Sequence, residues 1–128
     1  MIYLSVEQVL FIHARLIEST GGEHGVRDLD ILLSAIGRPY ASFDQQDLYP
    51  DLFSKTAALM ESLIPNHPFV DGNKRTGATA AGLFLILNGV RLTATNAELV
   101  AITMNIAKSQ GNLDVIRSWL KDNTQSIE

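Results

Sequence analysis

The sequence contains no cysteine, which excludes disulfide bonds and thiolate chemistry and suits a reducing compartment. It also has no uncharged apolar run of about 18 residues, the length at which a membrane-spanning helix becomes a candidate. The nearest run, residues 76–90, is too short and too rich in Gly, Thr and Asn. No basic and then apolar leader opens the sequence. These absences predict a cytoplasmic protein that does not act in a membrane.

Positive charge is scarce as well. Ten Lys and Arg residues face 14 Asp and Glu residues, so the formal net charge is −4. A nucleic-acid-binding domain would be basic, and direct binding to DNA or RNA is therefore not expected. A chain of 128 residues can bury roughly two-thirds of its unfolded surface. Because it shows no repeat, low-complexity tract or long linker, we expect one domain spanning residues 1–128.

An uncharged, small-residue stretch, residues 76–88, stands at the centre of the predicted fold. A helix that is apolar on nearly all sides is usually buried. Five small residues would let neighbouring helices approach its axis closely: Gly77, Ala78, Ala80, Ala81 and Gly82. Asn88-Gly89 is a common helix C-terminus, because glycine readily adopts positive φ. The pattern predicts a buried central helix from Thr76 to Asn88.

Apolar residues at helical spacing predict five more helices around this one. Their predicted starts are Ser5, Leu29, Pro50, Thr95, and Asn112 or Leu113, with the fourth running to about Ser109 and broken by Gly111. Residues 90–93 are expected to form an extended linker, and the tail after Asp122 to be frayed. Residues 38–46 are either irregular, with Tyr40 and Phe43 packed on the core, or a short hairpin. The fold class is a small all-α helical bundle.

Reactive groups gather in the loop before the central helix. His67 carries an imidazole, the side chain that most often acts as a general base, and Asp71 offers an oxygen ligand suited to Mg²⁺. Gly72 permits a tight turn, while a helix N-terminus attracts anions. Lys74 and Arg75 add two cations there, where the helix dipole disfavours them unless an anion binds. Together these groups predict transfer of a phosphorus group from a nucleotide to a hydroxyl.

The segment His67-Pro-Phe-Val-Asp-Gly-Asn-Lys-Arg75 resembles the Fic superfamily motif, H-x-F-x-(D/E)-G-N-x-R-x-x-R. Lys74 and the following Thr76 are similar to the Doc (death-on-curing) branch, as are Gly21-Gly22 and Gly25-Val26-Arg27-Asp28. The resemblance implies His67 as base, Asp71 as metal ligand, and a phosphate site at Gly72, Asn73, Lys74, Arg75 and Thr79. The second Fic arginine would fall at Ala78, so a phosphate clamp for AMP transfer is missing.

Fic enzymes typically transfer AMP from ATP to a protein hydroxyl. Doc-like toxins instead transfer the γ-phosphate of ATP to a threonine of elongation factor Tu and arrest protein synthesis. Each is paired with a small, partly disordered antitoxin that folds over a groove near the active site. The resemblance implies a Mg²⁺-dependent toxin kinase of this kind, with a flap hairpin near residues 38–46 that aligns the target. AMP transfer and a non-catalytic binding module remain as alternatives.

Other polar residues have simpler interpretations. His13 lies among apolar helix residues and is expected to be a core histidine bonded to the backbone. Glu23 and His24 are two potential metal ligands without a third, so solvated loop residues are expected. Ser19 and Glu23 match the spacing of an inhibitory Fic motif, (S/T)-x-x-x-E-(G/N), but His24 replaces its last residue and self-inhibition is not expected. Phe69 is expected to anchor the reactive loop in the core.

Overall fold

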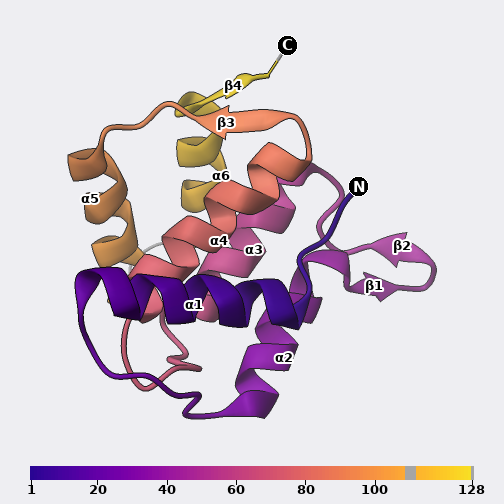
Figure 1. Cartoon of the computed structure of the whole chain (residues 1–128). Coiled ribbons are helices and arrows are strands. Elements are labelled where there is room, and N and C mark those ends of the chain that lie inside the picture. Colours follow the sequence, from indigo (N-terminus) through magenta and orange to yellow (C-terminus); the bar gives the residue numbers. More distant parts are fainter. Residues whose placement is uncertain (109–111, 128) are drawn as a thin grey trace.

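Helices make up most of the computed structural model, which describes residues 1–108 and 112–127 (Figure 1). The helices are α1 (Val6–Thr20), α2 (Leu29–Gly37), α3 (Leu52–Leu63), α4 (Asn73–Leu87), α5 (Asn96–Ala107), α6 (Leu113–Asp122) and the short 3-10 helix η1 (Arg38–Tyr40). The strands are β1 (Ser42–Phe43), β2 (Gln46–Asp47), β3 (Val90–Leu92) and β4 (Thr124–Ser126). The predicted all-α class is confirmed. The predicted helix end near Ser109 and the break at Gly111 lie outside the described residues.

Side-chain caps fix several helix starts where local sequence predicts them. Ser5 and Gln8 form a capping box on α1, and Thr95 and Glu98 form one on α5. The predicted start of α3 at Pro50 is wrong by two residues. Asp51 is the cap, because its carboxylate accepts the Ser54 N–H and the Ser54 hydroxyl bonds back to the cap.

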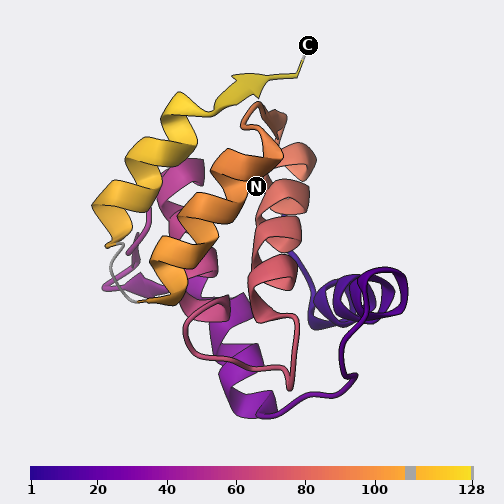
Figure 2. The same ribbon diagram turned by 90° about the vertical axis from the view of Figure 1, so that its left-hand side faces the viewer.

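Helix α4 lies between two parts of the core, as the central-helix prediction requires. Figure 2 shows α1 on one side of α4, and α5 and α6 on the other. Phe84 packs with Leu32 and Leu59 in one apolar cluster, whereas Leu85 packs with Ile106 in the second. Burial is not complete, since Ile86 is 53% exposed.

The predicted start of α4 at Thr76 is also wrong. Gly72 has a left-handed φ of 77° and serves as the N-cap, so Asn73, Lys74 and Arg75 form the first helical turn. At the other end Asn88 is the C-cap, and Gly89 has a φ of 86°. The phosphate-site residues therefore belong to a rigid helix rather than to a loop.

Two glycines of α4 allow a matched test of this packing. A methyl group at Gly77 would collide with Cγ1 of Ile64, a fully buried residue, whereas one at Gly82 would lie 3.7 Å from Cδ1 of Leu92. Alanine gains about 1 kcal/mol of helix propensity, but overpacking costs about 1–3 kcal/mol. We expect Gly77→Ala to lower the free energy of unfolding by up to about 2 kcal/mol and Gly82→Ala to raise it by about 0.5–1 kcal/mol. Urea unfolding measures both, and equal stabilisation would show that α3 and α4 are not tightly packed at Gly77.

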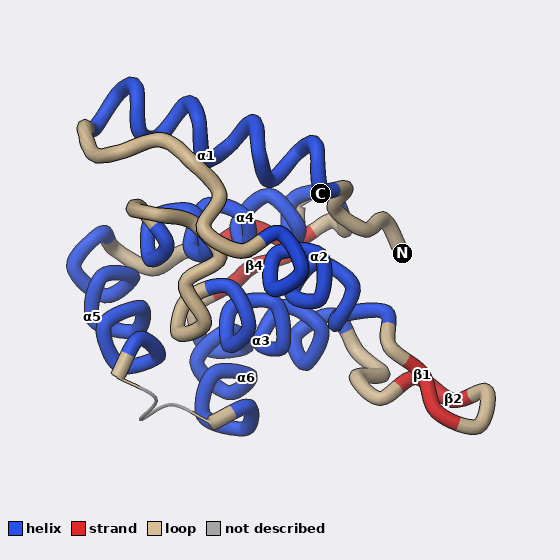
Figure 3. Tube along the Cα trace, turned by 90° about the horizontal axis from the view of Figure 1, so that it is seen from below, coloured by secondary structure: helices blue, strands red, loops and turns tan. Residues whose placement is uncertain are grey.

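The hairpin predicted near residues 38–46 is present but shifted. Residues 38–40 form η1, while β1 and β2 pair antiparallel across a two-residue turn at Asp44 and Gln45, whose φ values are 53° and 66°. The hairpin extends away from the helices (Figure 3). Phe43 is 77% exposed, so the alternative in which it packs on the core is wrong. The tip of a two-stranded hairpin has no second layer to pack against.

The base of this hairpin is fastened to the core through Lys55. The side chain of Lys55 is buried, and its Nζ donates to Pro39 O at 3.1 Å and to Asp47 Oδ2 at 3.2 Å. The same ammonium lies 5.6 Å from the centre of the Tyr3 ring. The hairpin therefore projects from a fixed base.

The C-terminal segment is more ordered than predicted. Strand β4 pairs antiparallel with β3, with Arg91 opposite Gln125, and the Ile127 N–H donates to Gly89 O at 2.8 Å. The extended conformation expected at residues 90–93 is confirmed, but its pairing in a sheet was not predicted, and the expectation of a frayed tail after Asp122 is wrong. No described helix has both the length and the apolar character that crossing a bilayer requires.

Candidate active site

The loop between α3 and α4 is anchored by Phe69. Its side chain is 1% exposed and stacks on His13 of α1, with ring centres 3.8 Å apart and planes 7° apart. His13 is itself buried, and its Nε2 lies 2.8 Å from Asp71 O. Because a carbonyl oxygen only accepts, the His13 nitrogen donates there. Phe69 as an anchor and His13 as a core histidine bonded to the backbone are both as predicted.

The segment before α2 lies beside this loop like a short strand. Val26 and Phe69 form an antiparallel bridge, and the Val70 N–H donates to Gly25 O at 3.0 Å. The N–H groups of Arg27 and Asp28 both reach Pro68 O. The loop is thus fixed by residues about 40 positions earlier in the chain.

Asn73 fixes the loop from the other side. Its Oδ1 accepts the Phe69 N–H at 3.0 Å, and its Nδ2 donates to Phe69 O at 3.0 Å and lies 3.4 Å from Nδ1 of His67. The side chain is 7% exposed. Since the amide is committed to the loop, only the main-chain N–H of Asn73 remains for the predicted phosphate contact.

His67 itself is exposed, so its imidazole can reach a substrate. Its φ is 52°, a left-handed value that residues other than glycine adopt rarely. The loop therefore holds the backbone of His67 in an uncommon conformation, at the position where the sequence predicts a base.

Asp71 lies four residues after His67 and presents a partly exposed carboxylate. Its Oδ2 accepts the Glu23 N–H at 3.1 Å, and its Oδ1 accepts the Gly72 N–H at 2.8 Å. The Glu23 N–H first, and then the Gly72 N–H, hold the pKa of Asp71 below its usual value. The group is therefore a carboxylate at neutral pH, as a metal ligand must be.

The loop after α1 can approach Asp71 only because of a glycine. A Cβ on Gly22 would lie 2.6 Å from Asp71 Oδ2, and Gly22 has a φ of 115°. Glu23 contributes its main-chain N–H, not its side chain, and both Glu23 and His24 are exposed, as expected. Across the described residues, no three His, Cys, Asp or Glu side chains are grouped to hold a metal.

The two predicted phosphate-binding cations have different environments. Arg75 Nη1 donates to the Thr20 hydroxyl and, at 3.0 Å, to Gly21 O, and its Nη2 lies 3.9 Å from Asp71 Oδ1. Lys74 is exposed and forms no ion pair within residues 1–108 and 112–127. The end of α1 and Asp71 thus hold the Arg75 guanidinium, so Arg75 has partners without a bound anion, whereas Lys74 has no carboxylate partner among the described residues.

A cavity of about 700 Å³ opens beside this helix start, between α1, α4 and α5. Its lining includes three of the predicted phosphate-site residues, Lys74, Arg75 and Thr79, and apolar side chains such as Leu16, Leu99 and Met104. Thr79 is exposed, so it is not a buried helix hydroxyl. The volume lies in the usual range for small-molecule and cofactor sites.

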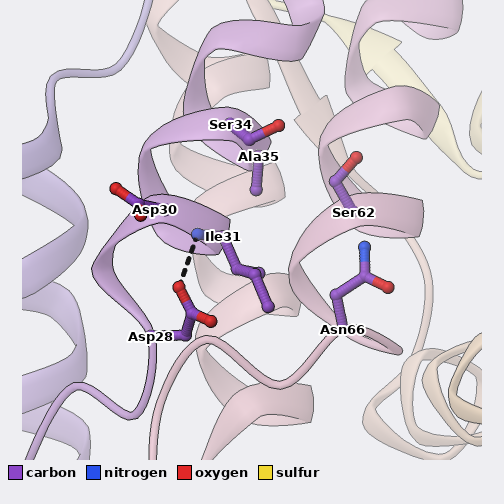
Figure 4. Close-up of a pocket in the computed structure, with 7 residues that line it drawn as sticks. All are labelled: Asp28, Asp30, Ile31, Ser34, Ala35, Ser62 and Asn66. Carbon is purple, nitrogen blue, oxygen red and sulfur yellow. Dashed lines mark hydrogen bonds between the residues drawn. The ribbon is translucent and has the colours of Figure 1, made fainter.

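A smaller cavity, of about 300 Å³, lies between α2 and the end of α3 (Figure 4). Its lining residues are Asp28, Asp30, Ile31, Ser34, Ala35, Ser62 and Asn66. Asp28 caps α2 by accepting the Ile31 N–H at 3.0 Å. Two carboxylates at its edge disfavour a phosphate, so the larger cavity is the candidate nucleotide site.

Comparisons with known proteins show which family this sequence matches. The sequence model of the Fic/DOC family matches residues 3–85, which contain every predicted site residue. Toxin Doc of Mycolicibacterium smegmatis is 53% identical over 74 residues, which are 58% of this chain and 57% of that protein. Protein kinase doc of Escherichia phage P1 is 30% identical over 121 residues, 94% of each chain.

Proposed function

Because the chain belongs to the Fic/DOC family, we propose that it is the toxin of a toxin–antitoxin pair and a protein-modifying phosphotransferase. In this proposal it moves the γ-phosphate of ATP to a hydroxyl of a translation factor such as elongation factor Tu. One observation carries the proposal: an exposed His67 and an anionic Asp71 lie on one fixed loop that leads into the positive end of α4. The printed names of the two relatives, a toxin and a protein kinase, support it.

His67 is the proposed base. Its exposed imidazole accepts the proton of the incoming hydroxyl as the oxygen attacks the γ-phosphorus, and ADP leaves. Asn73 and Phe69 keep the loop in place during this step, because neither side chain has room to move. Most of the rate enhancement would come from positioning and charge stabilisation.

The residues present fit Mg²⁺. Mg²⁺ usually takes one or two carboxylates together with substrate phosphates, and Asp71 supplies one carboxylate with a lowered pKa. When bound, the ion would neutralise charge on the phosphates. Gly72 supplies the left-handed turn at the N-cap, with its own N–H bonded to Asp71, while Asn73 and Arg75 offer main-chain N–H groups at the helix start. Lys74 and Thr79 add side chains beside the cavity.

The proposed partners match two exposed features. The hairpin leaves free strand edges that could align a target segment by β-augmentation. Beside the 700 Å³ cavity, Phe11, Val100 and Met104 are 65%, 60% and 41% exposed. An antitoxin segment that folds into an amphipathic helix could cover such apolar side chains. A translation-factor target would place the protein in the cytoplasm.

The experiment that tests this function is a transfer assay with elongation factor Tu and Mg²⁺. Parallel reactions receive ATP labelled at the γ- or the α-phosphate. We expect label from the γ position alone, because Lys74 resembles the Doc branch and Ala78 stands where the second Fic arginine would fall. Label from the α position would instead establish AMP transfer. No transfer of either label, combined with no Mg²⁺-dependent ATP binding, would favour a binding module.

A further inference from the structure

We propose that Arg27, at the end of the strand-like segment before α2, is a positioning residue for His67. This inference rests on the proposed function, in which His67 is the base. The Arg27 guanidinium donates from Nε to His67 O at 2.6 Å and from Nη2 to Asn66 O at 2.8 Å. The main-chain N–H of the same residue donates to Pro68 O at 2.8 Å. One arginine therefore binds three consecutive carbonyls centred on His67.

The left-handed backbone of His67 explains why such a clamp is needed. A non-glycine residue at a φ of 52° keeps that conformation only where its surroundings impose it. The ring of His67 is exposed and its described side-chain hydrogen bond, to Asn73 Nδ2, is long at 3.4 Å. The direction of the ring is therefore set by the peptide groups on either side of Cα, and Arg27 holds both of their carbonyls.

Among the described residues, the charge of Arg27 is not paired with an opposite charge. Arg27 is exposed, yet it forms no ion pair with a carboxylate in the described part of the chain. Its planar guanidinium is directed instead at two neutral carbonyls of the loop. A lysine ammonium is a single point of charge and cannot reproduce this forked contact.

The kinetic test compares Arg27→Ala and Arg27→Lys with a matched control, Arg91→Ala. Arg91 is also exposed and bonds to a neutral partner, Gln125, far along the chain from the loop. Misplacement of a catalytic group costs about 10²-fold, so kcat should fall by about 10–100-fold in Arg27→Ala, with KM for ATP changed less than about twofold. Guanidinium at non-denaturing concentration should restore part of the rate to Arg27→Ala, and Arg27→Lys should remain impaired.

A second readout does not depend on activity. The NMR chemical shifts of His67 Cα and Cβ report its left-handed backbone, and should change in Arg27→Ala but not in Arg91→Ala. If Arg27→Ala does not fold, the same shifts are measured in Arg27→Lys. Unchanged His67 shifts would overturn the proposal, as would a raised KM for ATP with normal kcat. If the wild-type protein transfers no phosphate, the proposed function fails, while the NMR comparison still decides whether Arg27 sets the His67 conformation.

Discussion

Replacing His67 by alanine is expected to reduce phosphoryl transfer by about 10²–10⁴-fold, the usual contribution of a general base. The imidazole is exposed at the loop and has no buried packing to lose. The lower rate therefore reflects the missing base rather than a less stable protein. Initial rates with saturating ATP and varied target protein measure the effect. His24→Ala is the matched control, because His24 is also exposed and should leave the rate within about twofold of wild type.

The backbone at this position calls for a second variant. Alanine in a left-handed conformation costs about 1–2 kcal/mol, whereas asparagine tolerates it better. His67→Asn therefore preserves the loop and still removes the base. Both variants should lose the same activity. Wild-type rates in His67→Asn would remove His67 from the mechanism, and a loss confined to His67→Ala would assign the effect to the backbone.

Replacing Phe69 by alanine should lower the free energy of unfolding by about 3–5 kcal/mol, the range for truncating a buried aromatic. Phe69 is 1% exposed, packs in the core cluster that contains Leu32 and Phe84, and stacks on His13. The cavity left behind borders the loop, so activity should also fall under conditions where the variant remains folded.

Urea unfolding with a common m-value measures this loss of stability. Phe43→Ala is the control, because Phe43 is 77% exposed and its replacement should change stability by less than about 0.5 kcal/mol. Phe69→Leu retains most of the volume and should cost less than about 1.5 kcal/mol. A loss below about 1 kcal/mol in Phe69→Ala would show that the loop is not anchored through this ring.

The sequence predicted helix starts correctly where a side chain forms the cap. The capping boxes of α1 and α5 each lie within four residues, and both are present. The start of α4 was misjudged because its cap, Gly72, acts through backbone conformation and offers no side-chain pattern. Strand β4 was missed because its partner β3 lies more than 30 residues earlier, and pairing at that distance leaves no local periodicity.

For the candidate site, too, the sequence predicted what lies within one short segment and missed contacts between distant segments. The spacing of His67 and Asp71 fixes their neighbourhood, because both belong to one short loop. The partners of Arg75 at Thr20 and Gly21, and of Asp71 at Glu23, arise only when α1 packs against α4. No pattern within the loop could have indicated them. The side chain of Asn73 likewise serves the loop itself, which sequence spacing does not distinguish from binding a phosphate.

The order of these contacts along the chain bears on synthesis. The described partners of the loop are His13, Glu23, the segment 25–28 and residues of the first turn of α4, so a ribosome makes them all before α5 begins. The outer wall of the 700 Å³ cavity, from Asn96 to Met104, is translated afterwards. The residues that fix the reactive loop and the residues that form the outer wall of the cavity therefore belong to separate stretches of the sequence, so a change in α5 can alter the cavity without touching the contacts that hold the loop.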